Sequence, residues 1–189
     1  MIRVGDDHPR ACTGARLLRF GWASEPPRRS SAGVAPIVLD PFAARPLSRV
    51  DRTVAEQGGL LAVDCSWNRL SAEGHLAPRS LGSARGGHGR RLPLLVATNP
   101  QHYGRVGELN TAEALGAALA ILGHEDEGRA LLDGFAGGRS FFEVNRERIR
   151  AYEEAGDPDA VLRAERTLFG AEPSTAGPDP GSRPRERRN

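Results

Sequence analysis

Three short apolar segments, each soon followed by turn residues, most constrain the fold that this chain can adopt. They are residues 36–39, 60–63 and 93–97, and an Asp or Asn follows each within two residues. Segments this short and this apolar are typical of strands buried on both faces. Stretches with helical spacing lie between or after them. Because such an alternation favours parallel pairing, the sequence predicts an α/β fold with a parallel sheet.

The second half of the chain is predicted to be mainly helical. Asn110 precedes a helix that begins at Thr111, and Glu113 at its third position completes a capping box. Amphipathic spacing predicts further helices over residues 125–135, 141–155 and 159–169. The chain therefore divides into an N-terminal α/β part, a mainly helical part and a disordered tail, which span residues 1–92, 93–170 and 171–189.

Composition excludes several classes of protein. The two cysteines, Cys12 and Cys65, form neither a disulfide framework nor a CxxC pair, and no metal site is predicted. No apolar run approaches the ~20 residues that cross a bilayer. The N-terminus is too acidic for a secretory signal. We therefore expect a cytoplasmic monomer with no membrane partner.

The net charge of +2 hides a basic middle and an acidic C-terminal half. No Asp or Glu occurs between Glu73 and Glu108. This basic stretch contains Arg79, Arg85, Arg90, Arg91 and Arg105. Arginine contacts to phosphate give sequence-independent affinity, so the stretch predicts an RNA partner. A solvated loop is the alternative interpretation.

Polar residues follow two of the predicted strands. Asp64 and Trp67 come after the second strand, and Thr98 and Asn99 come after the third. In open parallel sheets ligands bind beyond the carboxyl ends of the strands, so both segments are expected to line one crevice. Each polar residue, taken alone, is better explained by satisfying turn backbone. Turn chemistry does not require the indole of Trp67.

The chain resembles the aminocarboxypropyltransferases that modify small-subunit ribosomal RNA. The resemblance covers about residues 7–155, and any one of its motifs alone is weak. Their order over this length makes it specific. The motifs are residues 9–14 (PRACTG), 38–41 (VLDP), 63–67 (VDCSW), 91–100 (RLPLLVATNP), 103–105 (YGR) and 109–115 (LNTAEAL).

The resemblance implies a SPOUT-like knotted fold in which the helical C-terminal part completes the cofactor cleft. It implies transfer of the 3-amino-3-carboxypropyl group of S-adenosyl-L-methionine to N3 of a pseudouridine or N1-methylpseudouridine. The expected partner is small-subunit (16S or 18S) rRNA or a pre-ribosomal particle. By the same resemblance the cofactor contacts fall on Thr13, Val63, Leu92, Gly107 and Thr111, several of them through backbone groups.

Given such a reaction, the chemistry of the sulfonium and the place of both residues after the second strand make Asp64 and Trp67 the predicted catalytic residues. Two roles are open for Asp64, which either accepts the N3 proton or orients the loop. Trp67 is expected to form one wall of a pocket for the methyl group of the sulfonium, whose cation an aromatic face favours. Burying the methyl leaves the aminocarboxypropyl arm in line with the acceptor, and the carbon in line is the one transferred.

The sequence departs from the family pattern in three places. Gly107 stands where a large aromatic residue is usual, residues 71–90 are longer and richer in glycine, and Asp7-His8 replaces a more basic stretch. Two other functions are therefore weighed against the first. One is a SPOUT-type RNA methyltransferase, and the other is an RNA-binding ribosome-assembly factor without catalysis.

Overall fold

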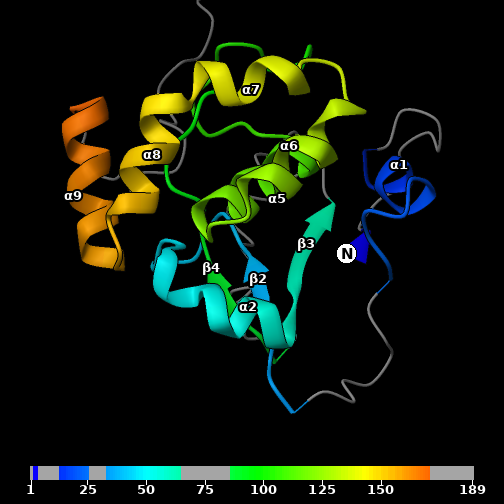
Figure 1. Cartoon of the computed structure of the whole chain (residues 1–189), viewed down its shortest axis with the longest axis horizontal. Helices are drawn as coiled ribbons and strands as arrows, with labels where there is room; N and C mark the ends of the chain where they lie inside the picture. The colour runs from blue at the N-terminus through cyan, green and yellow to red at the C-terminus, as the bar shows by residue number, and fades with distance from the viewer. Residues whose placement is uncertain (1, 4–12, 26–32, 65–85, 171–189) are drawn as a thin grey trace, which may run out of the picture.

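The computed structural model describes residues 2–3, 13–25, 33–64 and 86–170. Within these ranges four short strands form one sheet in the order β1-β3-β2-β4, and every pair is parallel (Figure 1). The predicted α/β class with a parallel sheet is therefore confirmed. The strands are β1 (Ile2–Arg3), β2 (Ile37–Leu39), β3 (Leu60–Asp64) and β4 (His88–Arg90).

Helices cover the sheet and continue into a helical C-terminal part. Asn110 and Asp157 cap two of them by accepting backbone hydrogen bonds, as their sequence patterns predict. None of the described helices is long and apolar enough to cross a membrane. The helices are α1 (Thr13–Arg19), the 3-10 helix η1 (Arg49–Asp51), α2 (Arg52–Gly58), α5 (Thr111–Ile121), α6 (Glu125–Asp133), α7 (Gly138–Val144), α8 (Arg146–Glu154) and α9 (Pro158–Phe169).

Helix α5 joins the sheet to the rest of the helices. It packs against β3, α1, α6 and α8, and Figure 1 shows it over the upper end of the strands. Leu17 of α1, Ile37 of β2 and Ile121 of α5 are fully buried in one apolar cluster. Because a single core spans both parts of the chain, the sheet and the C-terminal helices hold each other in place.

Two glycines bring α5 and α6 close together. A Cβ on Gly128 would lie 2.7 Å from the carbonyl oxygen of Gly116, and a Cβ on Gly116 would lie 2.9 Å from the Leu132 side chain. The obstacle at Gly128 is backbone, so no larger residue fits there without moving the helices apart, whereas a larger residue at Gly116 would require the Leu132 side chain to shift. The contact therefore fixes the separation of α5 and α6.

The prediction of a strand over residues 93–97 is wrong. The fourth strand is β4, which ends at Arg90, and the residues after it are extended without a continuous strand neighbour. Only isolated bridges occur there, between Pro46 and Arg91 and between Val96 and Val106. The apolar pattern correctly indicated burial, since Leu95 and Ala97 are fully buried.

Side chains from the C-terminal helices pair the backbone that a strand neighbour would otherwise pair. The Leu94 N–H donates to Glu165 at 2.8 Å, and the Tyr152 hydroxyl donates to the Leu94 carbonyl at 2.9 Å. Burial raises the pKa of the Tyr152 phenol, so its hydroxyl stays a donor even in alkaline solution. Asn145 bonds both the N–H and the carbonyl of Val96, at 2.8 and 2.9 Å. The backbone groups of Leu94 and Val96 are thus satisfied by α8, α9 and the residue before α8, while Leu95 and Ala97 pair with residues 104–107.

The single helix predicted over residues 141–155 is two helices that break at Asn145. This residue is fully buried and lies between α7 and α8 with non-helical dihedral angles, φ −103° and ψ 11°. Its side-chain amide donates to the carbonyl of Phe141 as well as to that of Val96. The side chain therefore competes with the helical backbone for partners, which ends α7. Helical spacing in the sequence does not reveal such a distant partner.

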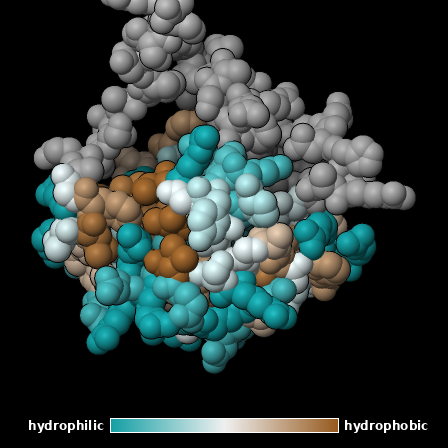
Figure 2. All heavy atoms as spheres, turned by 90° about the horizontal axis from the view of Figure 1, so that it is seen from above, coloured by the Kyte–Doolittle hydropathy of each residue, from teal (hydrophilic) through white to brown (hydrophobic). Residues whose placement is uncertain are grey.

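Most large apolar side chains are buried, but a few remain at the surface. Figure 2 shows small hydrophobic patches between hydrophilic side chains on the face seen from above. Phe20 and Trp22 belong to the exposed set and follow α1 directly. The set consists of Phe20, Trp22, Phe42, Val50, Tyr103, Val106 and Val144.

An ion pair with little solvent contact holds α9 to the segment after β4. Arg91 donates twice to Glu165, at 2.8 and 2.6 Å, and the two side chains are only 16% and 5% exposed. Hydrogen bonding to Glu165 raises the pKa of the Arg91 guanidinium. Two parallel bonds of this kind fix orientation as well as distance.

Glu165→Ala is expected to lower the free energy of unfolding by about 3 kcal/mol, because it leaves the Arg91 charge and the Leu94 N–H without their partner. Urea denaturation measures this change. Glu154→Ala is the matched control, since Glu154 pairs with Arg150 on an exposed face of α8. A Glu165 variant as stable as the Glu154 variant would contradict the assigned role.

Candidate active site

The carboxyl end of β3 carries the first predicted site residues. β3 ends at Asp64, so Val63 and Asp64 lie at this edge of the sheet, beside Ile2 and Arg3 of β1. The position of the strand end is as predicted. The side chains of Val63 and Asp64, and the whole of Trp67, lie outside the described residues. Their roles stay predictions.

Thr13 and Thr111 each begin a helix, and the two helices pack together. Thr13 is the first residue of α1 and Thr111 the first of α5. α5 packs against both α1 and β3. Three predicted contact positions, Thr13, Val63 and Thr111, therefore lie on elements that touch one another. The end of α5 nearest Thr111 carries the positive end of its helix dipole, which favours an anionic group.

Leu92 and Gly107 lie on two segments that pair with each other. The Gly107 N–H donates to the Leu95 carbonyl at 2.8 Å, and Val96 and Val106 form an antiparallel bridge between them. Gly107 has φ of 80°, a conformation that strains any residue with a side chain. The departure from an aromatic residue at this position therefore has a backbone explanation. Among the residues that the structure describes, a Cβ there would meet only Leu94, at 3.9 Å, so these residues leave the space beside Gly107 open.

The Glu113 carboxylate binds the loop after residue 97. Its Oε1 accepts from the N–H groups of Thr98 and Asn99, both at 2.7 Å, and lies 3.0 Å from the Thr98 hydroxyl. Its Oε2 accepts from the Asn99 side chain at 2.6 Å and from the Asn110 N–H at 3.0 Å. Glu113 is only 2% exposed. One buried carboxylate thus joins this loop to the residues that begin α5.

Sequence reasoning identified only part of the role of Glu113. The capping box that joins it to Asn110 is confirmed. The bonds to Thr98 and Asn99 were missed, because the capping-box pattern indicates only the pairing of Glu113 with Asn110. Asn99 is buried by these bonds, and its side-chain oxygen accepts from the His102 N–H. These bonds support the alternative of turn chemistry for the Asn99 side chain, and its place in a ligand crevice stays a prediction.

Asp40 is a second buried carboxylate that sequence reasoning did not single out. It follows β2, is 1% exposed, and accepts from the Phe42 N–H through Oδ1. Its Oδ2 is buried without a hydrogen-bond partner in the part of the chain that the structure describes. β2 pairs with β3, which places Asp40 near the same edge of the sheet as Asp64.

Two arginines of the basic stretch are not available to phosphate. Arg90 pairs with Asp51 at 2.9 Å, and its side chain is 13% exposed. Arg91 is bound to Glu165 as described above. Arg105 is exposed but lies 3.2 Å from Glu108. The expectation that Arg90 and Arg91 contact RNA phosphates is therefore wrong, and Arg85 lies outside the described residues.

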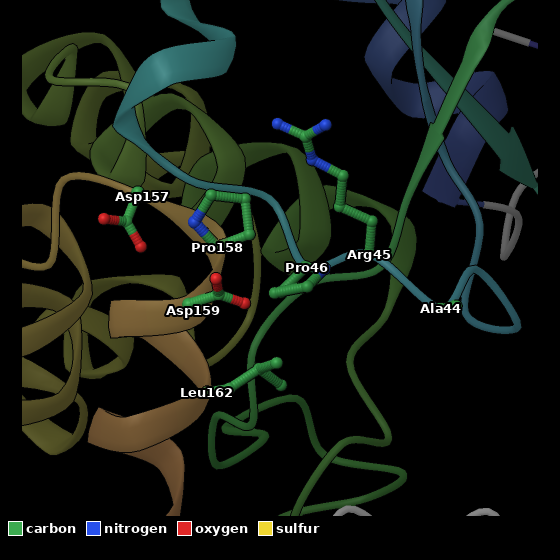
Figure 3. Close-up of a pocket in the computed structure, with 7 residues that line it drawn as sticks. All are labelled: Ala44, Arg45, Pro46, Asp157, Pro158, Asp159 and Leu162. Atoms are coloured by element: carbon green, nitrogen blue, oxygen red, sulfur yellow. The ribbon is translucent and has the colours of Figure 1, made fainter.

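An open pocket of about 490 Å³ lies between the loop after β2 and the start of α9 (Figure 3). None of the seven predicted site residues lines it. Asp157 caps α9 by accepting from the Ala160 N–H, and the Arg45 side chain extends away from Asp159 in Figure 3. Its polar groups do not converge on a common point, so the pocket is not a candidate for the chemistry.

Comparison with known proteins identifies the family. A family model described as "Ribosome biogenesis protein, C-terminal" matches residues 37–169. The chain is 38% identical to the 16S rRNA aminocarboxypropyltransferase of Methanopyrus kandleri, over 87% of this chain and 94% of that protein. It is 40% identical to the 16S rRNA aminocarboxypropyltransferase of Halobacterium salinarum, over 88% and 93%.

A solved structure is similar as well. The SAM-dependent rRNA:acp-transferase Tsr3 from Vulcanisaeta distributa superposes with a TM-score of 0.75 at 37% identity, covering 90% of this chain and 88% of that one. The α/β sheet and the helical C-terminal part thus have a solved counterpart. The chain belongs to the family of small-subunit rRNA aminocarboxypropyltransferases.

Proposed function

We propose that this protein transfers the 3-amino-3-carboxypropyl group of S-adenosylmethionine to small-subunit rRNA during ribosome biogenesis. The acceptor is N3 of a pseudouridine or N1-methylpseudouridine. N3 loses its proton and bonds to the terminal carbon of the arm, whose bond to sulfur breaks to release methylthioadenosine. The observation that carries the proposal is the likeness, over nine-tenths of the chain, to a transferase with this donor.

The residues that would bind the donor are Thr13, Val63, Leu92, Gly107 and Thr111. In support, Thr13, Val63 and Thr111 lie on α1, β3 and α5, of which α5 contacts the other two, and the segments that carry Leu92 and Gly107 pair through the Val96–Val106 bridge. The open space beside Gly107 suits a planar base, and Thr13, the first residue of α1, would hold the carboxylate of the arm through a hydroxyl or amide donor. The residues present therefore fit an adenosyl group that carries an amino acid.

Asp64 and Trp67 are proposed as the catalytic residues. In support, β3 ends at Asp64, and β3 and α1 both pack against α5. We assign Asp64 the role of orienting its loop, with proton acceptance from N3 as the other role. Trp67 would close an apolar pocket around the methyl group, so that the methyl does not reach the RNA.

The division of the chain at residue 92 and the SPOUT-like knot are also parts of the proposal. Supporting the division, β4 ends at Arg90 and the larger helices begin at Thr111. The expectation that the helical part completes the cofactor cleft has support as well. The segment of residues 94–96 is bound to this part through hydrogen bonds from its backbone to Glu165, Tyr152 and Asn145. Family membership supports the knot.

Nucleoside mass spectrometry of small-subunit rRNA, from cells with and without the gene, tests the function. An aminocarboxypropyl adduct that disappears with the gene is the expected result. Loss of only a methyl group would favour the SPOUT-type methyltransferase. Unchanged nucleosides, together with no calorimetric binding of S-adenosylmethionine at millimolar concentration, would favour an assembly factor.

Trp67→Ala is expected to weaken S-adenosylmethionine binding and aminocarboxypropyl transfer together, because it removes one wall of the methyl pocket. Calorimetry measures the first and single-turnover transfer to RNA the second. Phe42→Ala is the control, since Phe42 is an exposed aromatic residue outside the predicted site. Wild-type binding and activity in the Trp67 variant would remove this residue from the site.

Glu113→Gln is expected to weaken S-adenosylmethionine binding about tenfold, because an amide cannot accept from all the donors that the carboxylate now holds. Glu147→Gln is the matched control, an exposed acid in the first turn of α8. Calorimetry and thermal unfolding are measured on both variants. If the Glu113 variant melts earlier but binds the donor as tightly as wild type, Glu113 stabilises the fold without positioning the site.

A further inference from the structure

Two aromatic side chains and two arginines form a surface at the end of α1. Phe20 and Trp22 follow the helix and are 45% and 43% exposed, although aromatic rings of this size are usually buried. Arg16 and Arg19 lie in the last turn of the helix. We call these four residues the α1 platform.

The Phe20 ring is held in place while one part of it faces solvent. It packs edge-on against the buried Phe135, with ring centres 6.1 Å apart and planes at 76°. The Arg16 guanidinium lies 4.7 Å from the Phe135 ring centre and donates to the Gly134 carbonyl at 2.7 Å. The Arg19 guanidinium lies 5.1 Å from the Phe20 ring centre. A ring fixed in this way loses little conformational entropy when a ligand stacks on it.

The positive charge of the platform is not neutralised within the described residues. Arg16 and Arg19 form no ion pair there, and α1 itself contains no acid. Arg90 and Arg91 differ, since each is bound to a buried carboxylate. Exposed aromatic faces beside unpaired guanidinium groups match a partner that offers both flat bases and phosphates, which is single-stranded nucleic acid.

We propose that the α1 platform binds unpaired bases of the RNA substrate by stacking. This inference rests on the proposed function. N3 lies on the pairing edge of the acceptor base, so that base must be unpaired to react, and the nucleotides beside it belong to a loop. Thr13, a predicted donor contact, lies on the same helix as the platform, about 10 Å from Phe20 along the axis. About three stacked nucleotides span that length.

The test compares Phe20→Leu/Trp22→Leu with wild type in binding a labelled single-stranded RNA of mixed sequence. Leucine keeps the apolar packing on Phe135 but removes the stacking face. The double variant is expected to bind this RNA at least about tenfold more weakly, with unchanged calorimetric affinity for S-adenosylmethionine. Phe42→Leu is the control, in the loop that reaches α9 on the side of the molecule opposite α1 (Figure 1).

A second variant tests the charge. Arg19→Ser is expected to reduce the slope of log affinity against log salt by about one, as loss of one phosphate contact does.

If both variants bind RNA like wild type while wild type still transfers the aminocarboxypropyl group, the platform is overturned and the proposed function stands. If wild type binds no RNA and modifies none, both are overturned. Loss of donor binding in the leucine variant would also overturn the platform, since the pair would then act through the fold.

Discussion

The buried backbone of residues 94–99 depends on side chains for many of its hydrogen bonds. Glu165, Asn145 and Glu113 supply these, from α9, from the break between α7 and α8, and from α5, while the backbone of residues 102–107 supplies others. A regular strand neighbour would have paired this backbone throughout, whereas here part of the pairing comes from side chains elsewhere in the chain. The C-terminal helices are thus attached to the segment that carries Leu92 by specific polar contacts as well as by apolar packing, and a buried polar group left unpaired is costly.

Much of the fold could be predicted from the sequence, because the signals are local. The apolar runs that became β2 and β3, the capping box at Asn110 and the Asp157-Pro158 start of α9 all depend on residues within a few positions of each other. The predictions that failed depend on distant partners. A strand was predicted over residues 93–97 because their apolar side chains indicate burial. The sequence does not indicate which groups pair their backbone. Asn145 breaks a helix for the same reason.

In the candidate site, too, the predictions that depend on neighbouring residues fared better than those that depend on distant partners. The resemblance located the donor-binding positions at element ends, and the structure brings Thr13, Thr111 and the end of β3 onto contacting elements. The prediction that the arginines of the basic stretch contact RNA failed for Arg90 and Arg91, because the net charge along a sequence does not show which arginines are already paired. Arg90 and Arg91 stabilise the protein, while Arg16 and Arg19, outside that stretch, have no acid partner in the described chain. Gly107, which departs from the family pattern, suits the positive φ of the backbone at its position.

The close contact of α5 and α6 through Gly116 and Gly128 has a consequence for how the two substrates would meet. Gly134 and Phe135, which follow α6, support Arg16 and Phe20, while α5 begins at Thr111 beside the proposed donor site. The proposed surfaces for the two substrates would therefore both be supported by this closely packed pair of helices. The approach of the acceptor base to the donor would then be set by the folded contact of α5 and α6. One methyl group added between the two glycines would change that approach.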